Sequence, residues 1–455
     1  MTCNIIILAA GQGTRMRSAL PKVLHKLADK SLLEHVCQTA NALSPSLLNI
    51  IYGHGGELVR QALAGLQVNW IEQAEQLGTG HAVAQALPFI QDDETVLILY
   101  GDVPLTKQAS LHALLEQVTA TSMGLLTIEL PDPTGYGRII RDAAGKVERI
   151  VEHKDATSAE RAINEVNTGM LAVNGGRLKE WLGKLGNDNA QREYYLTDII
   201  SMAVADGIEV KTVQASHRCE VEGVNDRLQL ARLERYYQNM KAEELMQAGV
   251  TLRDPARLDI RGELNCGQDV QIDINVIIEG RVSLGDNVQI GPNVMLKDCV
   301  IAAGARIEAN CVIEQAEIGT NSIVGPFARL RPGTQLAAKS KVGNFVEIKN
   351  ATIGEGSKVN HLSYIGDARL GKNVNIGAGT ITCNYDGANK HQTVIGDNAF
   401  IGSCSQLVAP VEIGPNATIG AGSTISKDAP ADALTLSRSP QKTLNNWQRP
   451  TKNKE

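Results

Sequence analysis

An aliphatic residue returns at every sixth position through long stretches of the second half of this sequence. Three series keep this spacing without a break: Leu264, Val270, Val276, Val282, Val288, Val294 and Val300; Ile318, Val324, Leu330, Leu336, Val342 and Ile348; and Ile395, Ile401, Leu407, Ile413, Ile419 and Ile425. A helix repeats every 3.6 residues and a strand every two, so neither element explains a period of six. A three-sided coil does, because each flat face takes six residues and each turn about 18. The spacing predicts a parallel β-helix of hexapeptide repeats whose period-six side chains point inward.

Length, charge and cysteine content bound the rest of the chain. With 455 residues, the chain is too long for one compact core, which predicts two or three domains. The net charge of −6 gives no general electrostatic reason to bind nucleic acid or an anionic membrane. The run Ile5–Ala10 is too short to span a bilayer and lacks a basic leader, so we expect no signal peptide. The cysteines lack paired short spacings, which favours reduced thiols in a cytosolic protein over a disulfide frame or a zinc site: Cys3, Cys37, Cys219, Cys266, Cys299, Cys311, Cys383 and Cys404.

Short apolar runs that alternate with amphipathic segments mark the first half of the chain. Ile5–Leu8, Leu48–Tyr52 and Val96–Tyr100 each indicate a buried strand followed by a turn and an amphipathic stretch. This alternation predicts an α/β domain with a Rossmann-like parallel sheet and helices on both of its faces. Asp226–Gly249 carries apolar residues among charges and ends at a glycine, which predicts one long helix. We therefore expect a first domain over 1–226, a linker helix over 227–250 and the β-helix domain over 251–455.

A glycine-bearing string follows the first predicted strand. Residues 8–16 read Leu-Ala-Ala-Gly-Gln-Gly-Thr-Arg-Met, and a Pro-Lys pair ends at Lys22. Gly11 and Gly13 let the backbone approach a ligand closely, and backbone N–H groups there can hold phosphate. Arg15 and Lys22 add two cations, which suits a pyrophosphate or a transferring phosphoryl group. The dinucleotide-binding fingerprint is excluded, because Met16 occupies the position of its third glycine.

The β-helix places residues one turn apart beside each other, because neighbouring parallel strands lie roughly 4.8 Å apart. Arg331 and Lys349 differ by 18 positions, and each directly follows a residue that we expect to point inward. Two cations on adjacent turns repel unless an anion lies against them, which makes this pair a candidate phosphate clamp. Four other residues share a slot two positions after an inward residue, namely His361, Ala378, Ser403 and Ala421.

His361 is the candidate general base of this half. A lone histidine is more often structural, but this one lies within sequence reach of the two cationic turns, whereas His391 lies in a polar loop without such neighbours. A neutral imidazole can accept a proton from an amine at neutral pH. The repeat breaks at Thr382–Thr393, a polar stretch that must bulge out of the coil and that we expect to carry function.

Two motifs and the β-helix together carry a family resemblance over nearly the whole chain. The string at residues 8–16 with its Pro-Lys pair resembles the signature of sugar-phosphate nucleotidyltransferases, and Leu99–Leu105 resembles their metal-binding strand end. Joined to a hexapeptide β-helix, these motifs are similar to the bacterial family of bifunctional N-acetylglucosamine-1-phosphate uridylyltransferases and glucosamine-1-phosphate N-acetyltransferases. The resemblance implies a left-handed coil, a hand that the spacing itself leaves open. It also implies a cytoplasmic homotrimer that makes UDP-N-acetylglucosamine for peptidoglycan and lipopolysaccharide synthesis.

For the first domain, the resemblance implies a Mg²⁺-dependent transfer from UTP to N-acetylglucosamine-1-phosphate. Asp102 and Asn225 are the implied metal ligands, and Arg15 and Lys22 the implied catalytic cations. The residues implied to contact UDP-N-acetylglucosamine are Leu8, Ala9, Ala10, Gly11, Lys22, Gln73, Gly78, Thr79, Tyr100, Gly101, Asp102, Gly137, Glu152, Asn167, Thr197 and Asn225. A plainer interpretation remains open for three of them: Asp102 as a strand-end cap, and Asn167 and Thr197 as structural polar residues.

For the β-helix domain, the resemblance implies acetyl transfer from acetyl-coenzyme A to glucosamine-1-phosphate, with His361 as the base. The implied contacts of glucosamine-1-phosphate are Arg331, Lys349, Tyr364, Asn375 and Lys390, and those of acetyl-coenzyme A are Ala378, Asn384, Tyr385, Ser403, Ala421 and Arg438.

Two alternatives compete with this interpretation. One is a single-reaction nucleotidyltransferase with a regulatory β-helix, which the cationic turns, His361 and the inserted loop disfavour. The other is a non-enzymatic scaffold of the same two domains, which the intact Gly11, Gly13, Arg15, Lys22 and Asp102 disfavour.

Overall fold

The computed structural model describes residues 2–53 and 55–452. The chain divides into two compact units, Met1–Tyr237 and Gln238–Glu455, and the division falls inside the long helix α9 (Arg227–Gln247). Each unit is considered by itself.

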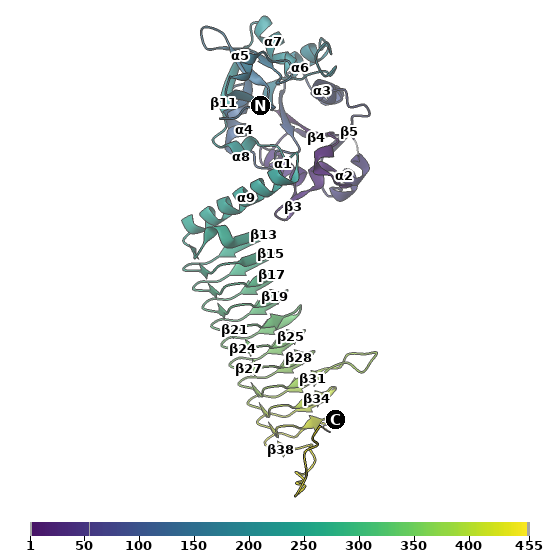
Figure 1. Ribbon diagram of the computed structural model, residues 1–455, viewed down its shortest axis with the longest axis vertical. Helices are drawn as coiled ribbons and strands as arrows, with labels where there is room; N and C mark the ends of the chain where they lie inside the picture. Colours follow the sequence, from purple (N-terminus) through teal and green to yellow (C-terminus); the bar gives the residue numbers. More distant parts are fainter. Residues whose placement is uncertain (1, 54, 453–455) are drawn as a thin grey trace. The chain divides into compact units, whose positions relative to one another are not determined.

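A nine-stranded mixed sheet forms the centre of the first unit (Figure 1). Its main path runs in the order β11-β7-β10-β6-β1-β4-β5, and β8 and β9 attach beside β10. The strands are β1 (Cys3–Ala9), β4 (Leu47–Tyr52), β5 (Asn69–Glu72), β6 (Thr95–Tyr100), β7 (Ser122–Glu129), β8 (Arg138–Arg141), β9 (Val147–Val151), β10 (Glu165–Asn174) and β11 (Glu209–Gln214). The predicted Rossmann-like sheet is confirmed around β1, which pairs in parallel with both β4 and β6. It is not parallel throughout, because β10 runs antiparallel to β6 and to β7.

Helices cover both faces of this sheet. The side chains of β1 alternate between two cores: Ile5 and Ile7 pack with residues of α1 and α4, and Ile6 packs with residues of α3, α6 and α7. Such alternation follows from the two-residue period of a strand. The helices are α1 (Leu32–Asn41), α2 (Gly56–Ala62), α3 (Thr79–Ala84), α4 (Gln108–Leu115), α5 (Ser158–Arg161), α6 (Gly175–Leu182), α7 (Asp198–Ala205) and α8 (Arg218–Val221).

The strand order determines where a ligand can bind. The chain passes from β1 to β4 on one side and later returns to pair β6 on the other side of β1. In open α/β sheets the loops at the carboxyl ends of strands separate at such a switch point and leave a crevice. The glycine-bearing string follows β1, and Gly101 and Asp102 follow β6, so both predicted motifs meet at this edge.

The second unit is the predicted parallel β-helix (Figure 1). Its turns supply an 11-stranded sheet, from β12 (Thr251–Leu252) to β38 (Leu434–Thr435), and a 16-stranded sheet that makes the other two faces. Most neighbouring turns outside the inserted loop pair in parallel at intervals of 17 or 18 residues, for example Leu330 with Ile348 and Ile348 with Ile365. The interval is 20 residues at the first turn, from Thr251 to Gln271, and 16 at the last, from Thr418 to Leu434.

The period-six side chains form the core of this unit, with one exception. All members of the second and third series are buried, and so are Ile365 and Leu370, which lie only five positions apart on a rung that is one residue shorter than the six-residue repeat. Leu264, at the start of the coil, is only partly buried. The inward position predicted for Val300 is wrong, because its side chain is 53% exposed and Cys299 points inward instead. The register shifts between β15 (Val276–Leu284) and β17 (Met295–Ile301), and a slip of one residue turns every side chain to the other face.

The inserted segment leaves the coil after β31 (Ile381–Cys383) and rejoins it at β32 (Thr393–Ile395). Its first and last residues, Thr382 and Thr393, stay buried in the coil, whereas 385–390 are exposed. Figure 1 shows this loop standing away from the turns beside β31. Within the described part of the chain, no helix combines the length and apolar character needed to cross a membrane.

Candidate active sites

A cavity of about 320 Å³ opens at the switch point of the first unit. It brings together residues that lie far apart in the sequence, from the loop after β1, the β5–α3 segment and the end of β6. Ten of the residues predicted for UDP-N-acetylglucosamine line it: Leu8, Ala9, Ala10, Gly11, Lys22, Gln73, Gly78, Thr79, Tyr100 and Asp102. Gly101 lies directly below, where its N–H donates to the Leu8 carbonyl at 2.9 Å.

The two glycines of the string serve different purposes. Gly13 has a φ of +62°, and a Cβ placed on it would lie 2.6 Å from Cβ of Lys22. Gly11 faces open space, with no atom within 4 Å of the same ideal position. Gly13 is therefore required by the backbone conformation and by the close approach of Lys22, whereas Gly11 leaves room at the cavity wall. Met16 is buried beside Leu27 and Leu32 and anchors the turn that follows.

Cations and oxygen atoms meet at one edge of the cavity, where Lys22 and Asp102 belong to its lining and Asn225 and the exposed Arg15 lie outside the lining. The ammonium group of Lys22 contacts a carboxylate oxygen of Asp102 and donates to Oδ1 of Asn225 at 3.3 Å. Nη2 of Arg15 donates to the same oxygen of Asn225 at 2.9 Å. The backbone N–H of Val224 donates to the Asp102 carbonyl at 2.9 Å, which fixes the segment of Asn225 against the end of β6.

This arrangement fits a hard divalent cation. The Asp102 carboxylate and the Asn225 amide oxygen already point to one positive group, the Lys22 ammonium, and both are oxygen donors of the kind that Mg²⁺ prefers. Mg²⁺ typically takes one or two protein ligands and keeps waters or substrate phosphates for its other positions. Among the described residues, no group of three or more His, Cys, Asp and Glu side chains that could hold a metal is found, so Asp102 and Asn225 are the two protein oxygen donors at this position.

The remaining predicted residues of this unit form a second group beside Tyr100. The Thr197 hydroxyl donates to Oε1 of Glu152 at 3.1 Å, and Gly137 lies directly against the Glu152 carboxylate. The N–H of Asn167 donates to the Gly137 carbonyl at 2.9 Å. This group is small, polar and partly buried, which suits the hydroxyl groups of a sugar.

Burial shifts the acidity of two of these side chains. Burial raises the pKa of the Glu152 carboxyl, and the nearby charges of Asp155 and Asp198 raise it further, against the hydrogen bond from Thr197. Burial also raises the pKa of the Tyr100 hydroxyl, and the charges of Glu152 and Asp102 add to this effect. Glu152 and Asp102 thus both act electrostatically on Tyr100.

Sequence reasoning missed two polar residues of the cavity, Gln76 and Glu193. Gln76 belongs to the same segment as Gln73 and Gly78, so that motif could have identified it. Glu193 lies in no motif and reaches the cavity only through tertiary packing. The Gly80 N–H donates to the Tyr194 carbonyl at 2.8 Å, and this contact brings Glu193 to the part of the cavity lined by Gly78 and Thr79.

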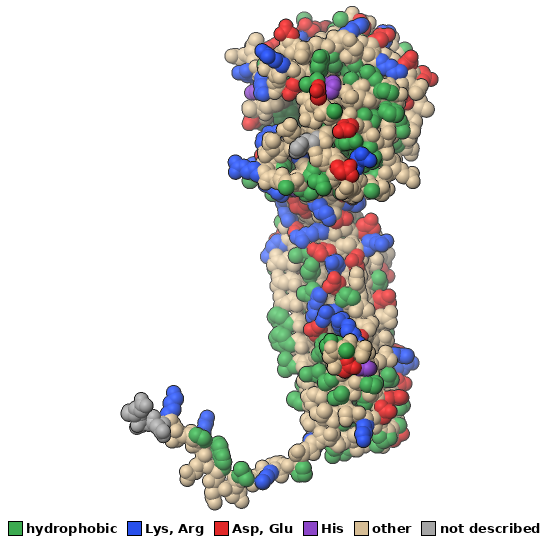
Figure 2. Space-filling view, turned by 90° about the vertical axis from the view of Figure 1, so that its right-hand side faces the viewer, with side chains coloured by type: hydrophobic (Ala, Val, Ile, Leu, Met, Phe, Trp, Pro, Cys, Tyr) green, Lys and Arg blue, Asp and Glu red, His purple; other side chains and the backbone are tan. Residues whose placement is uncertain are grey.

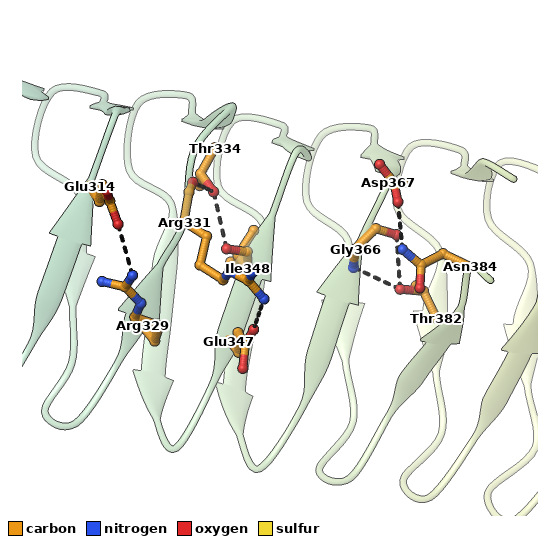
Figure 3. A network of polar contacts seen from close by, with 10 residues as sticks. All are labelled: Glu314, Arg329, Arg331, Thr334, Glu347, Ile348, Gly366, Asp367, Thr382 and Asn384. Carbon is orange, nitrogen blue, oxygen red and sulfur yellow. Dashed lines mark hydrogen bonds and ion pairs between the residues drawn. The ribbon is translucent and has the colours of Figure 1, made fainter. Parts of the chain in front are cut away.

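The β-helix unit gathers cations on the face formed by β22 (Arg329–Leu330), β25 (Glu347–Lys349) and β28 (Tyr364–Gly366). Arg331 and Lys349 lie on adjacent turns as predicted, because the Arg331 N–H donates to the Ile348 carbonyl. Nη1 of Arg331 is 2.7 Å from a Glu347 carboxylate oxygen (Figure 3). Lys390, from the inserted loop, and then Arg331 lower the pKa of the Lys349 ammonium. Figure 2 shows Lys and Arg side chains along the visible side of this unit, interspersed with acidic and hydrophobic side chains.

His361 ends β27 (Lys358–His361), one turn after Asn344. Its Nδ1 lies 3.0 Å from Oδ1 of Asn344, and its ring is exposed. An amide oxygen only accepts hydrogen bonds, so Nδ1 carries the proton in the neutral ring and Nε2 keeps its lone pair. His361 therefore presents an acceptor nitrogen to the outside of the coil.

The predicted residues of this unit do not all lie on one face. His361 and Asn375, in β30 (Asn375–Ile376), belong to the 11-stranded sheet, whereas Lys349 and Tyr364 belong to the 16-stranded sheet. The corner between His361 and Tyr364 joins the two faces. Tyr364 also contributes to the electrostatics of Arg331, so it connects this corner with the cationic group.

The residues predicted to contact acetyl-coenzyme A lie in two places, in a column on successive turns of the coil and in the inserted loop. Ala378, Ser403 and Ala421 stack, since the N–H of Cys404 donates to the Ala378 carbonyl and that of Gly422 to the Ser403 carbonyl. Nη1 of Arg438, in the segment after β38, donates to the Ala421 carbonyl at 2.7 Å. Asn384 and Tyr385 instead begin the inserted loop, where Asn384 donates to Asp367 (Figure 3) and the Tyr385 ring is exposed.

The loop has an internal frame of its own. Nε2 of His391 lies 2.7 Å from the Asp386 carboxylate, so this histidine has an acidic partner that sequence reasoning did not assign. Backbone N–H donors from Asn389 and Ala388, together with His391, lower the pKa of Asp386 well below its usual range. This turn holds Lys390 near Lys349.

Comparison with known proteins gives consistent matches along the chain. The MobA-like NTP transferase domain matches residues 5–155, the GMPPB C-terminal domain matches 260–340, and six bacterial transferase hexapeptide repeats match 392–427. Proteins named Bifunctional protein GlmU are similar over the whole chain. The one from Azotobacter vinelandii is 60% identical over 455 residues, covering 100% of both chains. Those from Stutzerimonas stutzeri and Methylococcus capsulatus are 60% and 61% identical, covering 99% and 98% of this chain and 100% and 97% of theirs.

The two glycines of the string can be separated by mutation. Gly13→Ala forces a side chain into the left-handed region against Lys22, and we expect it to lower the free energy of unfolding by about 1–2 kcal/mol. Gly11→Ala, the matched control, projects into open space, so stability should stay within about 0.5 kcal/mol of wild type. The added methyl group should nevertheless weaken UTP binding. Urea unfolding and calorimetric titration check both variants, and equal destabilisation by the two would contradict this division of roles.

Proposed function

The chain belongs to the family of bifunctional GlmU proteins, and we propose how its residues divide the two reactions of that family. The enzyme makes UDP-N-acetylglucosamine by transferring an acetyl group from acetyl-coenzyme A to glucosamine-1-phosphate and then a uridylyl group from UTP to the product. Pyrophosphate leaves in the second step, and the nucleotide sugar supplies cell-wall synthesis. We assign uridylyl transfer to residues 1–226, acetyl transfer to 251–455, and the connection to the helix within 227–250.

The observation that carries the uridylyl assignment is the mutual contact of Arg15, Lys22, Asp102 and Asn225 at the edge of the cavity. The sugar phosphate attacks the α-phosphorus of UTP, and the bond to the leaving pyrophosphate breaks. Lys22, in the cavity wall, and the exposed Arg15 beside it stabilise the charge that develops on the transferring and leaving phosphates.

Around this edge of the cavity, Gln73, Gly78 and Thr79 hold the base. Gly137, Glu152, Asn167 and Thr197, together with Tyr100, hold the sugar, so that the two substrates are positioned on opposite sides of the reacting phosphorus. Asp102 and Asn225 are the proposed ligands of Mg²⁺, which neutralises phosphate charge when it is bound.

The acetyl assignment rests on His361 and the nearby cations. Arg331, Lys349 and Lys390 bind the phosphate of glucosamine-1-phosphate, and the dianion relieves the repulsion that lowers the pKa of Lys349. Nε2 of His361 accepts a proton from the sugar amine as its nitrogen attacks the thioester carbonyl, and the coenzyme A thiolate leaves. Asn344 holds the ring in the tautomer that this step requires.

We infer a homotrimer in which neighbouring chains complete each acetyltransferase site. Phe327, Phe345 and Leu362 occupy one column of corners, all with positive φ and all 49–63% exposed. The two phenylalanine rings stack at 5.3 Å. Bulky side chains rarely adopt positive φ, and an exposed apolar column beside His361 fits an interface between chains.

The division of the predicted ligands between two faces of the coil and a projecting loop supports the same assembly. Three coils around one axis would bring the face of one chain against the loop of another, with equivalent heterologous contacts. We also place the enzyme in the cytoplasm, where UTP and acetyl-coenzyme A are available. The eight free cysteines fit that reducing compartment.

Removal of metal should separate the two reactions. We expect EDTA to abolish pyrophosphate release, because phosphate charge is then left unneutralised, and to leave acetyl transfer largely intact, because that step needs only a base and oriented substrates. Pyrophosphate and free coenzyme A thiol are measured in parallel, and added Mg²⁺ should restore the first. Loss of both activities in a folded protein would argue against a metal confined to the first domain.

Mutation of one cation and one base should produce reciprocal effects. His361→Ala removes the proton acceptor and should slow acetyl transfer by a factor of about 10²–10⁴, with uridylyl transfer unchanged. Arg15→Ala should slow uridylyl transfer and leave acetyl transfer unchanged, so that each variant is the control for the other. Steady-state rates of both half-reactions test this, and an acetyl rate within a few-fold of wild type in His361→Ala would require another base.

Subunit mixing tests the shared site. His361→Ala and Tyr385→Ala trimers should each lack acetyl transfer, but exchange of subunits should assemble some sites that contain both intact residues and so restore part of the rate. Acetyl transfer is followed after mixing, with each variant alone as the control. A fully active monomer in sedimentation would rule the trimer out.

A further inference from the structure

Arg138, the first residue of β8, is 1% exposed and lies between the two loops that carry Gly137 and Glu152. Among the described residues, no carboxylate forms an ion pair with its guanidinium group. Burying a charge without an ion pair is unfavourable, and an apolar side chain of similar volume would fill the same space without this penalty. The hydrogen bonds of the guanidinium group indicate the role of this buried side chain.

The guanidinium group connects three separate backbone segments. Nη1 donates to the Tyr136 carbonyl, directly before Gly137. Nη2 lies 3.3 Å from Nδ1 of His153, directly after Glu152, and 3.4 Å from the Arg161 carbonyl at the end of α5. An arginine only donates hydrogen bonds, so Nδ1 of His153 is the acceptor in this contact.

The segments at both ends of this connection are fixed independently. Glu160 caps the start of α5 and pairs with Arg149 of β9 at 2.6 Å, so α5 gives a firm base. Nε of Arg161 donates to the His153 carbonyl at 3.3 Å, which ties the histidine to the same helix. On the other side, the turn before Gly137 carries Tyr136, whose hydroxyl pKa is raised by burial and by the charges of Glu222 and Asp102.

We propose that Arg138 is a positioning residue that sets the spacing between Gly137 and Glu152 and thereby the affinity of the first unit for the sugar phosphate. The proposal rests on the proposed sugar pocket. Gly137 lies against the Glu152 carboxylate, so a small displacement of either segment changes the pocket that receives the sugar hydroxyls. The base-binding side is built on other segments, and the nucleotide should be bound without the help of Arg138.

The decisive variant is Arg138→Met in the full-length enzyme. Methionine keeps the apolar volume and removes the buried charge, but it also leaves the carbonyls of Tyr136 and Arg161 without this donor. We expect a folded protein whose melting temperature is within about 5 °C of wild type, a KM for N-acetylglucosamine-1-phosphate at least about tenfold higher, and a KM for UTP within about threefold of wild type. Acetyl transfer should be unchanged. The matched control is Arg141→Gln in the same strand, which breaks an ion pair with Glu165 and should change neither KM.

His153→Leu gives a milder test that leaves Arg138 in place. It removes one acceptor, so the KM for N-acetylglucosamine-1-phosphate should rise in the same direction by a smaller factor, and it decides the matter if the methionine variant does not fold. Two results in a folded variant would overturn the proposal. One is a KM for the sugar phosphate that stays within about threefold of the wild-type value, and the other is an equal rise in the KM for both substrates. A wild-type enzyme that transferred no uridylyl group to N-acetylglucosamine-1-phosphate would instead refute the proposed function.

Discussion

The backbone hydrogen bonds between successive turns of the β-helix are the constraint on which the second unit depends. They hold residues 17 or 18 positions apart side by side, and the inward aliphatic side chains between them form one continuous core. Each outward position is thereby placed in a column along one face or corner. Arg331 and Lys349 become neighbours in this way, and so do Ala378, Ser403 and Ala421. Most of the site on this surface is specified by column and turn, and the inserted loop adds Asn384, Tyr385 and Lys390.

The first unit reaches a comparable concentration of charge by different means. Its cavity is built from loops at the carboxyl ends of β1 and β6, which the strand order separates at the switch point. Arg15 and Lys22 are held there by oxygen atoms of Asp102 and Asn225. In the coil, by contrast, Lys349 and Lys390 repel each other, as the lowered pKa of Lys349 shows. Both arrangements favour a phosphate ligand. In the first unit the cations are already held in place by oxygen atoms, and in the coil a bound phosphate would relieve the repulsion between the lysines.

Buried polar side chains are concentrated in the part of the first unit that contains Gly137, Glu152, Asn167 and Thr197. Burial raises the pKa of the Glu152 carboxyl. Arg138 is buried nearby without an ion pair among the described residues. Such groups weaken a fold unless their hydrogen bonds are made, so their positions are narrowly defined. The bonds that Arg138 makes through Nη1 and Nη2 connect the segments that carry Gly137 and Glu152, whereas its buried Nε has no hydrogen-bond partner among the described residues.

The sequence by itself determined the two architectures, because the hydrophobic period and the placement of glycines act on the local backbone conformation. The period of six gave the coil, and the string at residues 8–16 located the cavity. Tertiary structure decided what depends on contacts between distant segments: the antiparallel β10, the exposure of Val300 after a one-residue register shift, and the entry of Glu193 into the cavity. It also paired His391 with Asp386 and enclosed Arg138. A spacing pattern specifies which face a residue occupies only while the register holds, and it carries no information about which remote segment will pack against that face.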